Sequence, residues 1–137
     1  MDFRFSSEDA TLQREAVEFV QQEWDPKGHD IEGNGLMGWD RGKGPGRGEE
    51  VDLLTQEFAK KLAAKGWWTM HWPKEFGGGG VSITTQLAYR EAMAYAGAPA
   101  AAGGGLTANP IMLAGQEWQK QEFLPKLASA EYMDFAQ

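Results

Sequence analysis

A turn rich in tryptophan, proline and glycine, followed by a capped helix, constrains the fold of this chain more than any other segment. Trp-Pro-Lys-Glu-Phe at residues 72–76 precedes four consecutive glycines, Gly77–Gly80. Pro73 fixes its own φ and pushes Trp72 into an extended conformation, while the glycines permit backbone angles that are closed to other residues. We therefore expect a sharp chain reversal at this turn, with helices on either side.

The helix after this turn has clear start and stop signals. Ser82 offers a side-chain oxygen to the first free amides, so we expect the helix to begin at Ser82. Gly97 suits the left-handed residue that follows a helix and Pro99 cannot continue one, so we expect the helix to stop near Ala96. The residues expected to form its buried stripe are Ile83, Leu87, Ala88, Ala92 and Tyr95.

Two amphipathic helices are expected before the turn. The first begins at the capping signal of residues 6–9 and runs to Trp24, because Pro26 follows. The second covers about residues 50–65 and stops at Gly66. Their expected buried residues are Leu12, Ala16, Phe19 and Val20 in the first helix, and Val51, Leu54, Phe58 and Leu62 in the second.

Two shorter helices are expected towards the C-terminus. Residues 106–115 are mostly apolar, which predicts a short buried helix with Pro110 in its first turn. A last helix starts at about Glu117, and Pro125 is expected to kink or interrupt it. Its expected buried residues are Phe123, Leu124 and Leu127. Residues 132–137 alternate large and small side chains, which predicts the opening of a β-strand.

These segments predict an all-α domain over residues 1–131, a bundle of about five or six helices with a glycine-rich loop at 28–48. A chain of 137 residues is one domain's worth and long enough to bury a core. The loop is longer than is usual in compact domains. Two states of it are weighed equally, a mobile excursion and an ordered flap that packs through Leu36, Met37 and Trp39.

Composition argues against several kinds of partner. The formal charge is −7 and no basic stripe follows any helix, so nucleic acid is not expected. The chain has no cysteine, and His29 and His71 lie too far apart for a local metal motif, so no metal site is expected. No 18-residue apolar run and no charged-then-apolar leader is present, which favours a cytoplasmic protein without a membrane span.

Two glycine motifs look like nucleotide-binding patterns. Gly33–Gly38 matches G-x-G-x-x-G, but no strand is predicted before it and no helix after it, so we interpret it as a chance match. Gly77–Gly80 lacks the Gly-Lys-Ser/Thr ending of a phosphate loop, so we interpret it as a turn.

Several side chains near the turn are candidates for chemistry, each with a structural alternative. Burial beside the apolar stripe would raise the pKa of Glu91 and make it a proton acceptor, but a hydrogen-bonded structural acid is favoured. His71 is favoured as a packed residue over an acid or a base. Core and interface positions are equally open for Trp67, Trp68 and Trp72.

The ordered elements between Trp72 and Pro99 resemble a signature of the acyl-CoA dehydrogenases. The resemblance continues through Asn109–Gly115, Gln119-Lys120 and Phe123–Pro125, and it covers the chain from about residue 50 to residue 137. Residues 28–48 depart from the shorter connection that members of this family generally have.

The resemblance implies the N-terminal, substrate-side domain of an FAD-dependent enzyme that dehydrogenates acyl-CoA thioesters. In such enzymes a carboxylate removes the α-proton while hydride passes from the β-carbon to the flavin. The base usually lies in a C-terminal bundle, so no catalytic residue is expected in this chain. The implied substrate-binding residues are Leu106, Thr107, Asn109 and Met112. The implied cofactor-binding residues, at the first strand of a missing flavin-binding β-domain, are Phe135, Ala136 and Gln137.

The resemblance further implies a homo-oligomer in the complete protein, and a truncated or split chain that is inactive alone and exposes apolar patches. A partner-dependent subunit and a non-enzymatic helical interaction module remain alternatives. Gly103–Gly105 stand where bulkier residues are often found in the family, which predicts a roomier or more flexible pocket that Gly104→Leu would test.

Overall fold

A computed structural model describes residues 5–24, 47–98 and 101–132 of the chain, with the side chains of helix α2 described from Leu53 onwards. The described elements are helices α1 (Ser7–Glu23), α2 (Arg47–Ala64), α3 (Ile83–Tyr95), α4 (Gly105–Ala114) and α5 (Glu117–Ala128), and the short 3₁₀ helix η2 (Lys74–Phe76). No strand occurs within these ranges, so the predicted all-α class, with about five or six helices, is confirmed.

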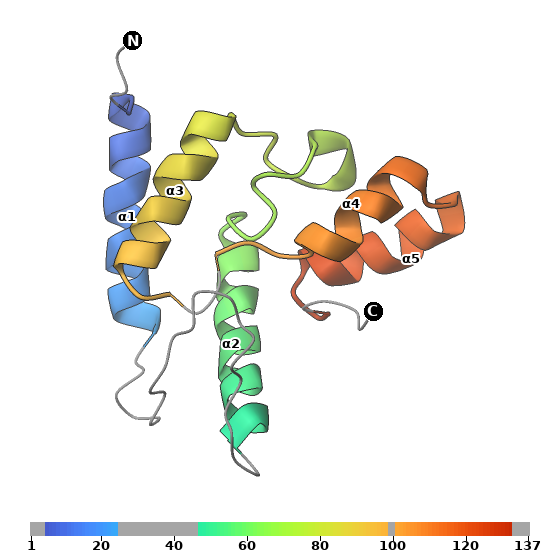
Figure 1. The fold of residues 1–137 in the computed structure, drawn as a ribbon, viewed down its shortest axis with the longest axis horizontal. Helices are drawn as coiled ribbons and strands as arrows, with labels where there is room; N and C mark the ends of the chain where they lie inside the picture. Colours follow the sequence, from blue (N-terminus) through green and yellow to red (C-terminus); the bar gives the residue numbers. More distant parts are fainter. Residues whose placement is uncertain (1–4, 25–46, 99–100, 133–137) are drawn as a thin grey trace.

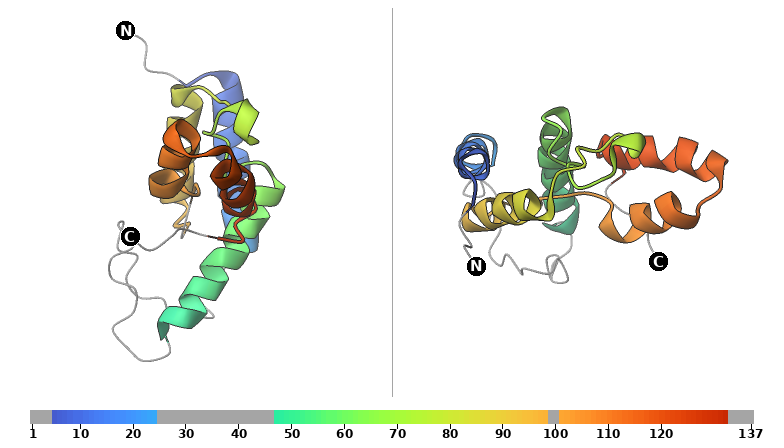
Figure 2. Two further views of the ribbon diagram at one scale, coloured as in Figure 1. Left: turned by 90° about the vertical axis from the view of Figure 1, so that its right-hand side faces the viewer. Right: turned by 90° about the horizontal axis from the view of Figure 1, so that it is seen from above.

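The helices form two groups joined by the tryptophan turn. Helix α3 packs along α1, with α2 beside them, while α4 and α5 pack against each other as a separate hairpin (Figure 1). The segment between α2 and α3 passes between the two groups, and the right-hand view of Figure 2 shows the α4–α5 hairpin projecting away from α1. The fold thus holds α4 at one end of the molecule.

The start of α1 follows the predicted capping signal. The Ser6 hydroxyl accepts a hydrogen bond from the Asp9 amide (3.0 Å), and the Asp9 carboxylate accepts one from the Ser6 amide (3.3 Å). Ala16 and Val20 are buried, while Leu12 and Phe19 are half-buried against the same core, so the predicted stripe is confirmed.

Helix α2 begins a few residues before its predicted start and ends as predicted before Gly66, which has a φ of +75°. Phe58 is buried, and its ring centroid lies 5.8 Å from that of Phe19 and 5.7 Å from that of Trp24. Leu62 is also buried and Leu54 is half-buried, as predicted. Phe58 thereby anchors α2 to the end of α1.

Helix α3 has the predicted ends but not the predicted buried face. The Ser82 hydroxyl accepts from the Thr85 amide (3.1 Å), and Gly97, with a φ of +75°, follows the helix. Of the predicted stripe, Ala88 and Ala92 are buried, but Ile83, Leu87 and Tyr95 are 68%, 57% and 85% exposed. Tyr89 and Met93 are buried in their place, because Tyr89 packs edge-on against Trp67 at 5.7 Å.

Helix α4 differs from the prediction in two respects. It begins at Gly105, so Pro110 lies in its second turn and not in its first. It is also not a buried helix, because Leu106 is 72% and Leu113 is 87% exposed, while Ala108 and Met112 are buried. A helix that is apolar on both faces gives no periodic signal from which to choose the buried one.

Helix α5 starts at Glu117 as predicted, and Leu124 and Leu127 are buried while Phe123 is half-buried. The helix is not interrupted at Pro125 but continues to Ala128. Pro125 removes only the hydrogen bond to the Gln121 carbonyl, and Gln121 is exposed, so water can satisfy that oxygen.

Several predictions fall outside the described residues. These concern the two states of the 28–48 loop with Leu36, Met37 and Trp39, the Gly33–Gly38 motif, His29, and the strand predicted for 132–137 beyond Tyr132.

The turn between α2 and α3 uses its glycines as predicted. The Gly80 amide donates to the Trp72 carbonyl (2.8 Å), and Gly77 and Gly80 have φ values of +82° and +58°. Gly78 lies so close to Trp72 that a β-carbon at this position would overlap the Trp72 carbonyl group. Trp72 itself is fully buried, so the turn folds the chain around this side chain.

Candidate functional site

Helix α4 is held in place by a small core cluster between the turn and α5. The buried members of this cluster are Trp72, Ala108, Met112, Leu124 and Leu127. The Trp68 indole Nε1 reaches the same region and donates a hydrogen bond to the Leu127 carbonyl (3.0 Å). The inward face of α4 is therefore fixed by packing, and its outward face is left to solvent.

The structure divides the four predicted substrate-binding residues between these two faces. Leu106 and Asn109 are exposed and lie three residues apart, on one side of α4. Thr107 is half-buried beside them. Met112 is only 8% exposed and belongs to the core cluster, so it supports the helix from behind. That these residues contact a substrate remains a prediction.

The glycines before α4 do not provide the roomier pocket that the sequence suggested. Gly103 and Gly104 are buried, and a β-carbon on Gly104 would lie 3.1 Å from Trp72 Cζ2 and 3.2 Å from Ala108 Cβ. Gly104 also has a φ of +65°, which disfavours any other residue. These two glycines make room for indole rings, so Gly104→Leu would disturb packing before it tested a pocket.

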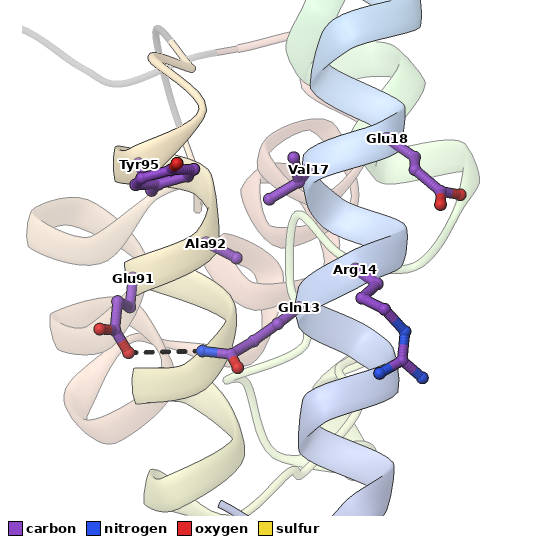
Figure 3. A pocket seen from close by; sticks show the side chains of 7 residues that line it. All are labelled: Gln13, Arg14, Val17, Glu18, Glu91, Ala92 and Tyr95. Carbon is purple, nitrogen blue, oxygen red and sulfur yellow. Dashed lines mark hydrogen bonds between the residues drawn. The ribbon is translucent and has the colours of Figure 1, made fainter.

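Glu91 is exposed, so the hypothesis of a buried proton acceptor is wrong. Its carboxylate accepts a hydrogen bond from Gln13 Nε2 (3.3 Å), and the same amide donates to the Ala88 carbonyl (3.2 Å). Glu91 thus helps tie α3 to α1, which agrees with the favoured reading of a hydrogen-bonded structural acid (Figure 3).

A groove of about 390 Å³ runs between α1 and α3, with Tyr95 at its edge (Figure 3). Val17 and Ala92 supply its apolar surface, and Arg14 and Glu18 border it. The full lining set is Gln13, Arg14, Val17, Glu18, Glu91, Ala92 and Tyr95. The groove can accept an apolar side chain, but its lining combines no nucleophile with a base.

Sequence reasoning missed this groove because it placed Tyr95 in the buried stripe. The sequence did contain one sign that some apolar side chains of α3 would be exposed, because α3 has more apolar residues than one face can bury. Ile83, Leu87 and Tyr95 lie outside the face formed by Tyr89 and Met93, and one helix face cannot bury all of them.

The three tryptophans are all core residues. Trp67, Trp68 and Trp72 are 8%, 1% and 0% exposed. Trp67 packs edge-on against Phe19 at 5.5 Å, and the Lys65 ammonium lies 4.4 Å from the centroid of Trp67. Of the two positions left open by the sequence, the structure selects the core.

His71 is half-buried beside Trp72, with its ring edge-on to the indole at 6.3 Å. Its Nδ1 atom is buried and has no hydrogen-bond partner within the described part of the chain. Burial, and then the positive charge of Arg90, lower the pKa of His71 below its ordinary value. The folded protein therefore favours the neutral, packed imidazole that the sequence suggested.

Lowering the pH is expected to destabilise the fold through His71. Its pKa is lower in the folded than in the unfolded chain, so the unfolded state takes up the proton first as the pH falls below about 6.5. The free energy of unfolding should fall from that pH down to the folded-state pKa. Urea unfolding across this range measures the slope, which His71→Gln should reduce. An unchanged slope would show that His71 does not titrate differently on folding.

Two kinds of feature are absent from the described ranges. No group of three or more His, Asp or Glu side chains is placed there to hold a metal ion. Among the same residues, no helix has both the length and the apolar character needed to cross a membrane.

Comparison with known proteins agrees with the elements described above. The family model "Acyl-CoA dehydrogenase, N-terminal domain" matches residues 6–131. The chain is 38% identical over 85 residues to the acyl-CoA dehydrogenase FadE26 of Mycobacterium tuberculosis, which covers 59% of this chain and 20% of that protein. It is 34% identical over 87 residues to the acyl-CoA dehydrogenase IpdE1 of the same organism, and this match covers 61% of the present chain and 23% of IpdE1.

One solved structure has a similar fold over almost the whole of the present chain. The ChsE4–ChsE5 complex from Mycobacterium tuberculosis matches with a TM-score of 0.71 and 27% sequence identity, over 96% of this chain and 30% of that chain. The present chain thus spans less than a third of the length of the proteins that it matches.

Proposed function

This chain belongs to the acyl-CoA dehydrogenase family, and we propose that it is the substrate-side domain of such an enzyme. The proposed enzyme introduces a double bond between the α- and β-carbons of acyl-CoA thioesters, and this chain forms its N-terminal domain. The domain is not catalytic by itself in this proposal.

The observation that carries the proposal is the outward face of α4. Leu106 and Leu113 are 72% and 87% exposed on a helix whose opposite face is packed against Trp72 and Leu124. Covering a fully exposed leucine contributes about 1.5–3 kcal/mol, so this face favours contact with an apolar chain or surface. We assign Leu106, Thr107 and Asn109 to the protein surface that contacts the acyl chain, called the wall below. Met112 supports these residues from the core.

The chemistry that this chain contributes is binding and orientation. The Asn109 amide can donate and accept hydrogen bonds at the edge of the apolar face, and the leucines exclude water from it. The base that removes the α-proton is proposed to lie outside these 137 residues. FAD, when bound, supplies the acceptor for the hydride. Its proposed contacts with Phe135, Ala136 and Gln137 lie outside the described residues.

The proposal includes an oligomer, because the similar solved structure is a complex of two differently named chains. On the family resemblance we propose a homo-oligomer, although that solved structure joins two different chains. A subunit that completes its site with a different partner chain is the second candidate, and the same comparison supports it. Nucleic acid is not a proposed partner, given the charge of −7. The proposed location is the cytoplasm.

Photoaffinity labelling tests the wall directly. The native protein that carries this chain is irradiated with an acyl-CoA bearing a diazirine at the end of its acyl group, and the labelled peptides are identified by mass spectrometry. We expect adducts on α4, at Leu106, Thr107 or Asn109, which excess unlabelled acyl-CoA abolishes. Competable adducts confined to residues outside α4 would contradict the assignment.

A further inference from the structure

The backbone that leads into α4 lies directly against two indole rings. A β-carbon on Gly103 would overlap Trp68 at Cε2 and Nε1, and one on Gly104 would lie 3.1 Å from Trp72 Cζ2. Both glycines and both tryptophans are buried. The two indole rings therefore contact the backbone of Gly103 and Gly104, directly before α4 begins.

Hydrogen bonds fix Trp68 at both ends of this contact. The Gly103 amide donates to the Trp68 carbonyl (3.0 Å), and the Trp68 indole donates to the Leu127 carbonyl on α5 (3.0 Å). A second link joins α2 to the segment after α5, where Gln56 Nε2 donates to the Glu131 carbonyl (2.8 Å). The ring of Trp68 thus spans the start of α4 and the end of α5.

We propose that Trp68 and Trp72 are positioning residues for α4, and that the close approach of Gly103 and Gly104 to their rings sets how far the outward face of α4 extends towards the acyl chain. This inference rests on the proposed function of that face. In this proposal Gly103 and Gly104 affect specificity through the position of α4 and not by widening the pocket. A side chain at either position would displace the whole helix.

The matched control lies next to the contact. A β-carbon on Gly105 would have nothing within 4 Å, and Gly105 is the first residue of α4. Gly103→Ala and Gly105→Ala therefore add the same methyl group two residues apart, the first against an indole ring and the second into open space.

The position of α4 can be measured by electron–electron double resonance, because the chain has no native cysteine. Spin labels at Glu57→Cys on α2 and Ala114→Cys on α4 use two exposed positions. Gly103→Ala should shift the distance between them by roughly 1–2 Å, the displacement that relieves the overlap of two carbon atoms. Gly105→Ala should leave it unchanged. A folded Gly103→Ala chain with the original distance would overturn the positioning role.

A second variant covers the case in which Gly103→Ala does not fold. Trp68→Phe removes indole atoms that the new methyl would meet, so the double variant Gly103→Ala/Trp68→Phe should fold and restore the original distance, with effects on stability that are far from additive. A double variant that fails to fold, or whose losses simply add, would contradict direct contact as the basis of positioning.

The proposed effect of Gly103 and Gly104 on specificity is tested in the complete native protein. The measured quantity is the ratio of kcat/KM for a long acyl-CoA thioester to kcat/KM for a short one. Gly103→Ala should change this ratio by about tenfold, the effect of adding or removing a methylene in an apolar pocket. Gly105→Ala should not change it. A displaced helix with an unchanged ratio would show that α4 does not face the acyl chain, and would overturn the proposed function while leaving the positioning intact.

Discussion

Replacing Trp68 with alanine is expected to lower the free energy of unfolding by about 3–5 kcal/mol, the range for deleting a buried aromatic side chain. Trp68 is 1% exposed and packs on Gly103, so its loss opens a cavity where α4 begins. It also removes the hydrogen bond from the indole to the Leu127 carbonyl (3.0 Å), which retains the Ala130 amide as a donor (3.2 Å). The thermal midpoint should fall by roughly 10–20 °C.

Trp118→Ala is the matched control, because Trp118 is 59% exposed on α5 and its ring contacts only Phe123 among the described aromatic residues. Its cost should stay below about 1 kcal/mol, as for most surface substitutions. Urea unfolding of both variants, followed by far-ultraviolet circular dichroism, gives the comparison. Equal losses in the two variants would contradict the central packing role of Trp68.

Gly78→Ala is expected to be the most damaging single-methyl addition within the turn. The new β-carbon would overlap the carbonyl group and Cβ of Trp72, and a backbone cannot move aside as the end of a flexible side chain can. Overpacking typically costs about 1–3 kcal/mol, and rigid neighbours place this change at or above the top of that range. Displacing Trp72 would also loosen the cluster beneath α4.

The unfolding midpoint of Gly78→Ala, set beside that of Gly105→Ala, checks this prediction. Gly105 is the first residue of α4 and a β-carbon there would have nothing within 4 Å, so Gly105→Ala should be neutral or gain less than the roughly 0.5–1 kcal/mol that favours alanine over glycine in a helix interior. Near-identical midpoints for the two variants would mean that the turn adapts to a side chain at position 78.

The helix ends and the turn were predictable from the sequence because their signals are local. Ser6 and Ser82 cap helices as predicted, and Gly66 and Gly97 follow helices with positive φ. Each of these residues acts through its own backbone or a neighbour within a few positions, so no knowledge of the rest of the fold is needed.

The buried faces of α3 and α4 were not predictable in the same way. Both helices carry apolar residues on more than one face, and only tertiary packing decides between them. On α3 the contact of Tyr89 with Trp67 accompanies the burial of Tyr89 and Met93, while the predicted Ile83 and Tyr95 are exposed. On α4 the cluster around Trp72 buries Met112 and leaves Leu106 exposed.

The candidate site shows the same division. Family resemblance pointed to α4, but the separation of Leu106 from Met112 needed the structure. The roles of Gly103 and Gly104 depend on indole rings more than thirty positions earlier in the chain, and the groove beside Tyr95 depends on how α1 meets α3. Contacts between residues so far apart leave no mark on local sequence patterns.

The most direct test of the central claim is the visible spectrum of the native protein that carries these 137 residues, recorded before and after addition of acyl-CoA thioesters of several chain lengths. A substrate-side domain of an acyl-CoA dehydrogenase predicts a flavin absorbance that at least one of these thioesters bleaches, because the bound flavin accepts the electrons of the reaction. A colourless protein, or a flavin spectrum that no acyl-CoA changes, would contradict the account.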